Sequence, residues 1–200
     1  MRVSRVQAAE NRENVINVAS RLFRSHGFDG IGLKDLMESA GLTQGAFYKQ
    51  FASKEDLAVE ASTRAFESAS RRWTAAVASH PKDPLGAVIA FYLSPEHREE
   101  QMNGCPIAAL GSDAARQGSD LKAPFEAGIK AHLELLERMI PGSTGAESRR
   151  KSTTKDKRKA MAILSTMVGA LTLARAVNDA GLAQAFLDAA ARQVREVAAA

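Results

Sequence analysis

Apolar residues recur along the chain at helical spacing. The clearest stripe near the N-terminus, with members at i, i+3, i+4 and i+7, is Leu33, Leu36, Met37 and Ala40. This spacing places the four side chains on one face of a helix of about two turns. Strand-like runs, in which Val, Ile and Thr alternate with polar residues, do not occur. The pattern therefore predicts an all-α protein.

Proline and glycine separate further helical stretches, because proline is favoured in the first turn of a helix and glycine just past its end. One long predicted helix joins a small N-terminal domain to the rest of the chain. We therefore expect two domains, one of residues 1–52 and one of residues 53–200. The helices expected beyond the stripe span residues 9–26, 54–79, 84–93, 95–102, 106–117, 121–140, 156–180 and 182–198.

A glycine turn follows the first stripe. Gly41 can take the left-handed conformation that closes a helix, and Leu42 can fold back onto the helix that it leaves. Thr43 is suited to cap a second helix over residues 44–51. The Ser-x-x-Asp pattern of residues 53–56 then predicts the capped start of a third helix. Two short helices, a glycine turn and a capped third helix are typical of a helix-turn-helix DNA-binding domain.

The second of these helices has an inner and an outer face. Phe47 and Phe51 point inward, whereas Gly45 leaves room near the helix start for a phosphate or base edge, where backbone donors also favour anions. Lys54, in the first turn of the next helix, opposes the helix dipole and suggests a phosphate partner. The residues predicted to contact DNA are Lys34, Thr43, Gln44, Gly45, Ala46, Tyr48, Lys49 and Lys54.

Residues 41–57, GLTQGAFYKQFASKEDL, resemble the signature of TetR-family transcriptional regulators, and residues 19–28, ASRLFRSHGF, match the same family. Together they cover about the first third of the chain. The resemblance implies a three-helix DNA-binding domain followed by a helical bundle for ligand binding and dimerisation. It also implies a repressor that a small molecule releases from its operator. Any three-helix bundle needs short helices and caps, so the prediction depends on their combination.

The last two predicted helices carry stripes that suit a dimer interface. Small residues let helices approach closely, and in TetR-family members such a pair forms a four-helix interface across a two-fold axis. A homodimer would present its two recognition helices to a palindromic double-stranded DNA operator, about 34 to 36 Å apart or more. A monomer is the alternative. The predicted interface residues are Ala162, Ser165, Gly169, Leu173, Phe186, Ala190 and Val194.

The stretch Asn103-Gly104-Cys105-Pro106 is a candidate sensing site. Pro106 suits the first position of a helix, which puts Cys105 at the N-cap, where backbone donors and the dipole stabilise a thiolate. Some TetR-family regulators that sense electrophiles or oxidants carry a reactive cysteine in a similar Gly-Cys-Pro stretch. The alternative is that Cys105 is a small buried apolar residue.

A small-molecule effector of unknown identity is the second expected partner. Arg175 is expected to support the thiolate or an anionic ligand, or else to pair with Asp179. The other candidates are apolar residues. They line a ligand cavity or are plain core, and we expect plain core for most of them. The candidate ligand-binding or sensing residues are Cys105, Phe66, Tyr92, Met102, Ile107, Phe125 and Arg175.

The net charge of +4 is unevenly distributed. Residues 1–60 hold eight basic and eight acidic residues, so the predicted DNA-binding domain is formally neutral, whereas residues 147–159 hold seven basic residues against two acidic ones. This basic run predicts a solvated or disordered loop leading into a helix. The alternative is a second electrostatic contact with DNA or an acidic partner. Arg2 and Arg5 form either a minor-groove arm or a disordered end.

Several classes of protein are disfavoured. The N-terminus lacks a signal peptide, the uncharged stretch 160–174 is short for a membrane span, and a single cysteine suits a reducing compartment, so we expect a cytoplasmic protein that does not bind membranes. Scattered histidines and the lack of a phosphate-binding loop predict no metal, no cofactor and no catalytic residues. A thiol enzyme using Cys105 with His97 or His132 is the alternative, and a helical interaction module without DNA binding is a third.

Overall fold

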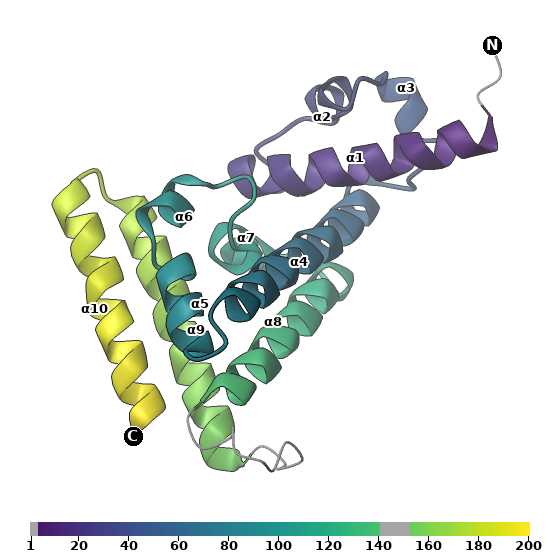
Figure 1. Ribbon diagram of the computed structural model, residues 1–200. Helices are drawn as coiled ribbons and strands as arrows, with labels where there is room; N and C mark the ends of the chain where they lie inside the picture. The colour runs from purple at the N-terminus through teal and green to yellow at the C-terminus, as the bar shows by residue number, and fades with distance from the viewer. Residues whose placement is uncertain (1–3, 141–152) are drawn as a thin grey trace. The chain divides into compact units, whose positions relative to one another are not determined.

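The computed structural model describes residues 4–140 and 153–200, and this part of the chain forms ten α-helices without any strand (Figure 1). The all-α prediction is confirmed. The helices belong to two compact units. Unit 1 comprises the residues up to 68 together with 101–126, and unit 2 comprises 69–100 and 127–200. The functional division expected at residue 52 stays a prediction.

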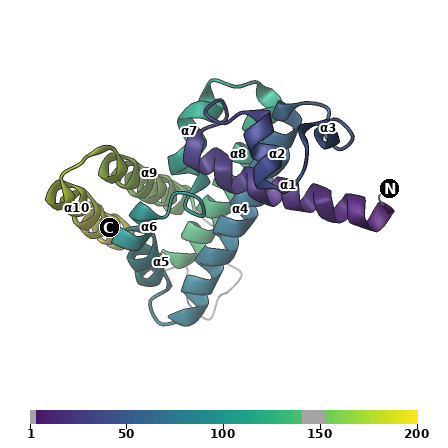
Figure 2. The same cartoon turned by 90° about the horizontal axis from the view of Figure 1, so that it is seen from above.

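Unit 1 is built around its first helix, along which α2 and α3 lie in both views (Figures 1 and 2). Ser4 caps α1, because its Oγ accepts a hydrogen bond from the backbone N of Gln7 at 3.1 Å. This cap starts the helix four residues earlier than expected. The helices of unit 1 are α1 (Arg5–His26), α2 (Leu33–Ser39), α3 (Gln44–Phe47), the first part of α4 (Lys54–Ser79), α7 (Pro106–Ala115) and the first turns of α8 (Ser119–Met139).

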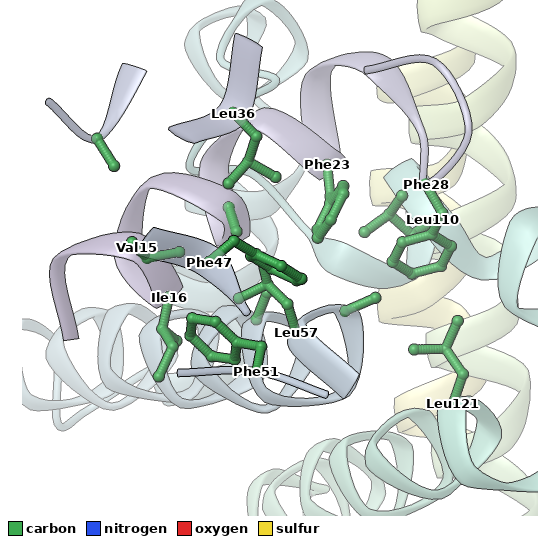
Figure 3. Close-up of a cluster of buried hydrophobic side chains, with 14 of the residues drawn as sticks. Val15, Ile16, Phe23, Phe28, Leu36, Phe47, Phe51, Leu57, Leu110 and Leu121 are labelled. Atoms are coloured by element: carbon green, nitrogen blue, oxygen red, sulfur yellow. The ribbon is translucent and has the colours of Figure 1, made fainter. Parts of the chain in front are cut away.

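The core of unit 1 consists of buried aromatic and aliphatic side chains (Figure 3). Phe23 and Phe28 meet edge to face with their ring centroids 5.4 Å apart, and Phe66 meets Phe125 in the same way at 5.2 Å. Burying side chains of this size supplies most of the stabilisation of such a domain. The labelled core residues are Val15, Ile16, Phe23, Phe28, Leu36, Phe47, Phe51, Leu57, Leu110 and Leu121.

Unit 2 contains the remaining parts of α4 and α8 with α5 (Pro84–Tyr92), α6 (Pro95–Glu99), α9 (Thr154–Ala176) and α10 (Ala180–Ala199). Helices α9 and α10 lie side by side and antiparallel, as both views show (Figures 1 and 2). Lys155 and Lys159, near the start of α9, donate to the carbonyls of Ala200 and Ala198 at 3.0 Å each. These cations satisfy carbonyls that the last turn of α10 leaves without a helical partner.

Two buried histidines set the core of unit 2 apart. The Nδ1 atom of His97 lies 2.7 Å from the carbonyl oxygen of Tyr92, and the Nδ1 atom of His132 lies 2.7 Å from that of Gly128. Trp73 meets the His132 ring edge to face at 4.5 Å. Burial lowers the pKa of His97 to about 4, with a smaller contribution from Arg175, and burial also lowers the pKa of His132.

Three further helix boundaries differ from the prediction for local reasons, and α9 also ends earlier than expected, at Ala176 rather than at residue 180. Helix α3 ends at Phe47, because the Phe47 carbonyl accepts from the backbone N of both Gln50 and Phe51 and the chain leaves the helix as a turn. Helix α6 ends at Glu99 rather than at residue 102. Helix α10 begins before Gly181, since Asp179 caps it by accepting from the backbone N of Leu182 at 2.8 Å.

Helix α9 is the one helix of the described residues that is long and apolar enough to cross a membrane. This criterion uses length and composition only, and a core helix of a water-soluble protein also meets it. The antiparallel packing of α9 on α10 is consistent with such a core helix. Within the basic run, residues 149–152 lie outside the described residues, as does Arg2, while residues 155–159 form part of α9.

Candidate nucleic-acid interface and sensing residues

The glycine turn between α2 and α3 has the predicted geometry. Gly41 adopts a positive φ of 72°, and its backbone N donates to the carbonyl of Glu38 at 2.9 Å. The backbone N of Leu42 donates to the carbonyl of Met37, also at 2.9 Å. These two bonds form a Schellman motif, in which a left-handed residue closes the last helical turn. The turn thus fixes the direction in which the chain enters α3.

Helix α3 is shorter than expected and capped differently. Thr43 has the extended backbone of an N-cap, with φ −83° and ψ 152°, but its side chain makes no capping hydrogen bond. The prediction that its hydroxyl caps the helix was therefore wrong. Because α3 has only four residues, its dipole is weak, so the anion-binding argument for its N-terminus does not apply.

Two buried phenylalanines anchor the segment that carries the outer face. Phe47 and Phe51 stack with their centroids 5.3 Å apart, and both are almost completely buried. Tyr48, between them, is 67% exposed and meets the Phe47 ring edge to face at 5.2 Å. Lys49 is exposed as well. The predicted inward and outward faces are confirmed, although residues 48–51 form a turn rather than a second helical turn.

Gly45 has space around it that the protein does not use. A Cβ atom built on Gly45 meets no atom within 4 Å, and the backbone there does not adopt a positive φ. Neither packing nor conformation in the described structure therefore requires glycine at this position. Thr43 and Gln44 beside it are exposed, and Ala46 is half-buried against the core.

The two other predicted cations have partners within the chain. Lys54 donates from Nζ to the carbonyl of Ile31 at 2.7 Å, which ties the start of α4 to the loop before α2. A phosphate is thus not needed to account for a cation in that first turn. Lys34 lies 3.8 Å from Glu38 one turn along α2, and both side chains are exposed. Such an exposed pair is weak and leaves Lys34 available to an anion.

Sequence reasoning missed the polar contacts that attach α1 to this region. Arg12 binds both carboxylate oxygens of Glu60, and its guanidinium lies 4.8 Å from the centroid of the Phe51 ring. The hydrogen bond to Glu60 raises the pKa of Arg12. Asn14 donates from Nδ2 to the carbonyl of Ala40 at 2.8 Å, at the end of α2. Arg12 and Glu60 are thus paired with each other within residues 1–60, a contact that single-residue patterns do not show.

Comparison with known proteins identifies the family. Residues 15–61 match the model of the bacterial regulatory proteins of the tetR family, a span that begins in α1 and ends in α4. This part of the chain therefore forms the DNA-binding domain of a TetR-type regulator. The transcriptional repressor NemR of Escherichia coli K12 is 24% identical over 134 residues, which are 66% of this chain and 67% of NemR. The regulator LmrA of Bacillus subtilis is 27% identical over 149 residues, 72% and 79% of the two chains.

Solved structures show the same TetR fold. A TetR-family regulator from Cytophaga hutchinsonii superposes with a TM-score of 0.81 at 22% identity, over 100% of this chain and 97% of that one. The reduced form of E. coli NemR gives 0.76 at 22% identity, over 94% and 97%. The protein is therefore a DNA-binding transcriptional regulator of the repressor type. TetR-type regulators are not enzymes, which removes the thiol-enzyme alternative.

Cys105 occupies the predicted N-cap of α7, with φ −62° and ψ 121° and with Pro106 in the first turn. Its side chain is only 5% exposed. The preceding carbonyl, of Gly104, accepts a 3.1 Å hydrogen bond from Arg24 of α1, whose buried guanidinium also donates to the carbonyl of Ser20. Within unit 1, the turn that carries Cys105 is thus bonded directly to α1.

Arg175 binds backbone carbonyls rather than Asp179, and its expected role toward a thiolate or an anionic ligand stays a prediction. Its guanidinium donates to the backbone carbonyls of His97 at 2.8 Å, Arg98 at 3.0 Å and Glu100 at 3.3 Å. These carbonyls lie at the C-terminal end of α6. A cation there binds acceptors that have no helical partner and interacts favourably with the negative end of the helix dipole. Asp179 instead caps α10. Arg175 therefore holds α6 onto α9.

The other candidate ligand residues are divided between the two units. Phe66 and Phe125 are packed in the core of unit 1, with Ile107 against them. Tyr92 is buried in unit 2, 5.7 Å from Trp73, and Met102 is exposed. None of the candidate ligand residues lines the groove of unit 2 that α4, α5 and α10 form. Their role in ligand binding stays a prediction.

The predicted dimer residues separate into two groups. Ala162, Ser165 and Leu173 of α9 are exposed and Gly169 is half-buried, so their stripe is accessible in the protomer. Ala190 and Val194 of α10 are 5% and 0% exposed because they pack within their own chain, which leaves them out of any interface. Phe186 is half-buried, and Met161 and Leu182 are apolar residues about half exposed on the same two helices.

Proposed function

We propose that this regulator binds a palindromic DNA operator as a homodimer, using the outer surface of α2, the turn and α3. The observation that carries the proposal is the contrast between buried Phe47 and Phe51 and the exposed Tyr48 and Lys49 beside them. The hydrogen bond from Asn14 to the carbonyl of Ala40 and the contact of Arg12 with the Phe51 ring fix this segment on α1. A rigidly supported, exposed polar surface is what base and phosphate contacts require.

The exposed face of α9 supports the dimer. Leu173 is 49% exposed in the protomer, and the small side chains of Ala162, Ser165 and Gly169 allow a second helix to approach closely. Regulators of this family are typically dimers that bind an operator and a small-molecule effector. Two copies related by a two-fold axis would present two α3 surfaces to successive major grooves, about 34 to 36 Å apart or more. We further propose that the protein works in the cytoplasm.

The test begins with selection of bound fragments from random DNA, which supplies the operator. We expect Tyr48→Ala to weaken operator binding at least tenfold, and Lys49→Gln to lower the salt dependence of binding by about one counterion. Lys122→Gln, which changes an exposed lysine of α8, is the matched control and should bind as the parent does. Full operator affinity in both Tyr48→Ala and Lys49→Gln, with a folded protein, would place the DNA contact elsewhere.

A second candidate function is release of the operator through Cys105. The observation that favours it is the Arg24 hydrogen bond to Gly104, because any change in the Cys105 turn acts directly on α1. When the Cys105 thiol adds to an electrophilic carbon, its proton passes to the reagent, and the added group must fit at a position that is only 5% exposed. The turn must then open, and the bond to Arg24 is lost. Structural burial of an unreactive thiol remains the alternative.

Cys105→Ser separates the two roles of the cysteine. We expect quinones, aldehydes or hypochlorite to release the parent protein from DNA and to leave the Ser variant bound. Arg24→Gln, which weakens the link to the Gly104 carbonyl, should bind operator but respond less to the same reagents. Unchanged release of Cys105→Ser by these reagents would rule out the cysteine as the sensor.

A further inference from the structure

Unit 2 contains a groove of about 680 Å³ that neither the DNA surface nor the dimer face uses. Its walls come from the C-terminal part of α4, the turn that follows, α5 and one residue of α10. The volume is within the range of about 300–1,000 Å³ that small-molecule sites occupy. The residues that line it are Arg72, Ala75, Ala76, Ser79, His80, Asp83, Gly86, Ala87, Ala90, Phe91 and Arg195.

The floor of this groove is formed by side chains that are both small and apolar. Ala75 and Ala76 contribute from α4, and Ala87 and Ala90 from α5. At one place Arg72 lies over the Phe91 ring, with 4.9 Å between its guanidinium carbon and the ring centroid, and it also reaches Glu100 at 3.3 Å. Those contacts hold Arg72 and Phe91 as a fixed wall.

The α10 side of the groove carries a cation with a weak internal contact. Nη1 of Arg195 lies 3.6 Å from Oδ2 of Asp83, which is beyond hydrogen-bond range, and the two side chains are 56% and 64% exposed. Asp83 is already engaged as the cap of α5, because Oδ1 accepts from the backbone N of Gly86 at 2.9 Å. An exposed pair of this kind contributes little, so an incoming anion can replace it.

Charge selects the class of ligand. The lining holds two arginines and one aspartate, so its formal charge is +1 with His80 neutral. A guanidinium binds a carboxylate through two parallel hydrogen bonds, which is stronger and more directional than a contact to a neutral group. We propose that this groove binds a small monocarboxylate with an apolar body, whose carboxylate meets Arg195 and whose body lies over the alanines. The site would be the effector site of the proposed repressor, and in that respect it rests on the proposed function.

The experiment titrates the purified full-length protein without DNA. The probes are decanoate and biphenyl-4-carboxylate, compared with their carboxamides and with acetate, and binding is measured by calorimetry. We expect both carboxylates to bind at least tenfold more tightly than their amides, and acetate to bind more weakly still. Equal affinity for acid and amide, equal affinity for acetate, or no binding at millimolar concentration would overturn the proposal.

Variants locate the site. Arg195→Gln should weaken carboxylate binding at least tenfold, and Ala90→Leu, which fills the groove from an exposed position of α5, should do the same. Arg192→Gln, an exposed arginine of α10 outside the groove, is the matched control and should bind normally. Normal carboxylate affinity in folded Arg195→Gln and Ala90→Leu would place the ligand elsewhere and overturn the assignment.

Operator binding is measured separately with and without the carboxylate, so the two proposals fail in different ways. We expect the carboxylate that binds to weaken operator affinity at least tenfold in the parent and not in Arg195→Gln. A protein that binds operator but no carboxylate contradicts the groove assignment alone. A protein that binds the carboxylate but no operator contradicts the proposed DNA surface alone. Carboxylate binding that leaves operator affinity unchanged would overturn the effector role of the groove.

Discussion

Units 1 and 2 differ in the polar groups that they bury. Unit 1 buries the guanidinium of Arg24, which keeps its charge at any ordinary pH and bonds to backbone carbonyls. Unit 2 buries His97 and His132, whose pKa values are both lowered by burial. The core that supports the DNA surface is therefore expected to be insensitive to mild acid, whereas the core beneath the groove is not. Mild acid is therefore expected to act on unit 2 and to leave the DNA-binding unit largely unchanged.

The largest effect should come from the core of unit 1. Phe47 is completely buried and stacks on Phe51 directly beneath the outer face of α3. Phe47→Ala should lower the free energy of unfolding by about 3–5 kcal/mol, because it removes buried apolar area and leaves a cavity. Chemical denaturation measures the loss, and operator binding should disappear with it. A loss below about 1 kcal/mol would show that this ring does not anchor the surface.

The pH dependence of unit 2 should be nearly as large. The pKa of His97 is about 4 in the folded protein against an ordinary value of 6.5, so between these values the unfolded chain binds a proton that the folded protein does not. The free energy of unfolding keeps its full value above pH 6.5 and falls as the pH decreases toward 4. The full shift corresponds to roughly 3 kcal/mol.

Trp73 is the single tryptophan of the chain and reports on unit 2, where it packs against His132. Its fluorescence should report the unfolding of unit 2 in acid. In His97→Gln, stability should fall less steeply with decreasing pH than in the parent protein. Hydrogen exchange in peptides from α1 to α3 should change less over the same pH range. Equal acid sensitivity of the two units would remove the contrast between them.

The dimer face offers a smaller and more selective change. Leu173→Glu places a charge on the exposed stripe of α9 without disturbing a buried position. We expect at least a tenfold weaker dimer by analytical ultracentrifugation, because two such charges would meet across a two-fold axis. Thr172→Glu, one residue away and also exposed, tests whether the stripe itself matters. A dimer unaffected by Leu173→Glu would exclude this face as the interface.

Much of the fold could be predicted from the sequence because its signals are local. Helical spacing, the glycine at residue 41 and the cap at Ser53 each act within four or five residues, and the structure contains all of them. The long helix Lys54–Ser79 has the predicted bounds. The same local signals overestimated the lengths of α3 and α6. After α3, a hydrogen bond from the backbone N of Gln50 to the carbonyl of Phe47, three residues earlier, closes a turn in place of a second helical turn.

The roles of single polar side chains could not be predicted, because they depend on residues far away in the sequence. Arg175 binds carbonyls more than 70 positions away, and Lys54 binds the carbonyl of Ile31. Arg195 reaches a groove whose other residues come from α4, α5 and the turn between them. Periodicity placed Val194 on a stripe of α10 but could not decide whether that stripe faces its own chain or a partner.

The two glycines of the helix-turn-helix give the most direct test of the DNA surface. Gly41 needs a positive φ, whereas Gly45 has ordinary backbone geometry and open space around it. Gly41→Ala should cost about 1–2 kcal/mol of stability through backbone strain. Melting temperature and operator affinity should be measured for both Ala variants in parallel. The account predicts that Gly45→Ala melts at or above the parent temperature and yet binds operator at least tenfold more weakly. Parental affinity in a stable Gly45→Ala would contradict the claim that DNA approaches α3 at this point.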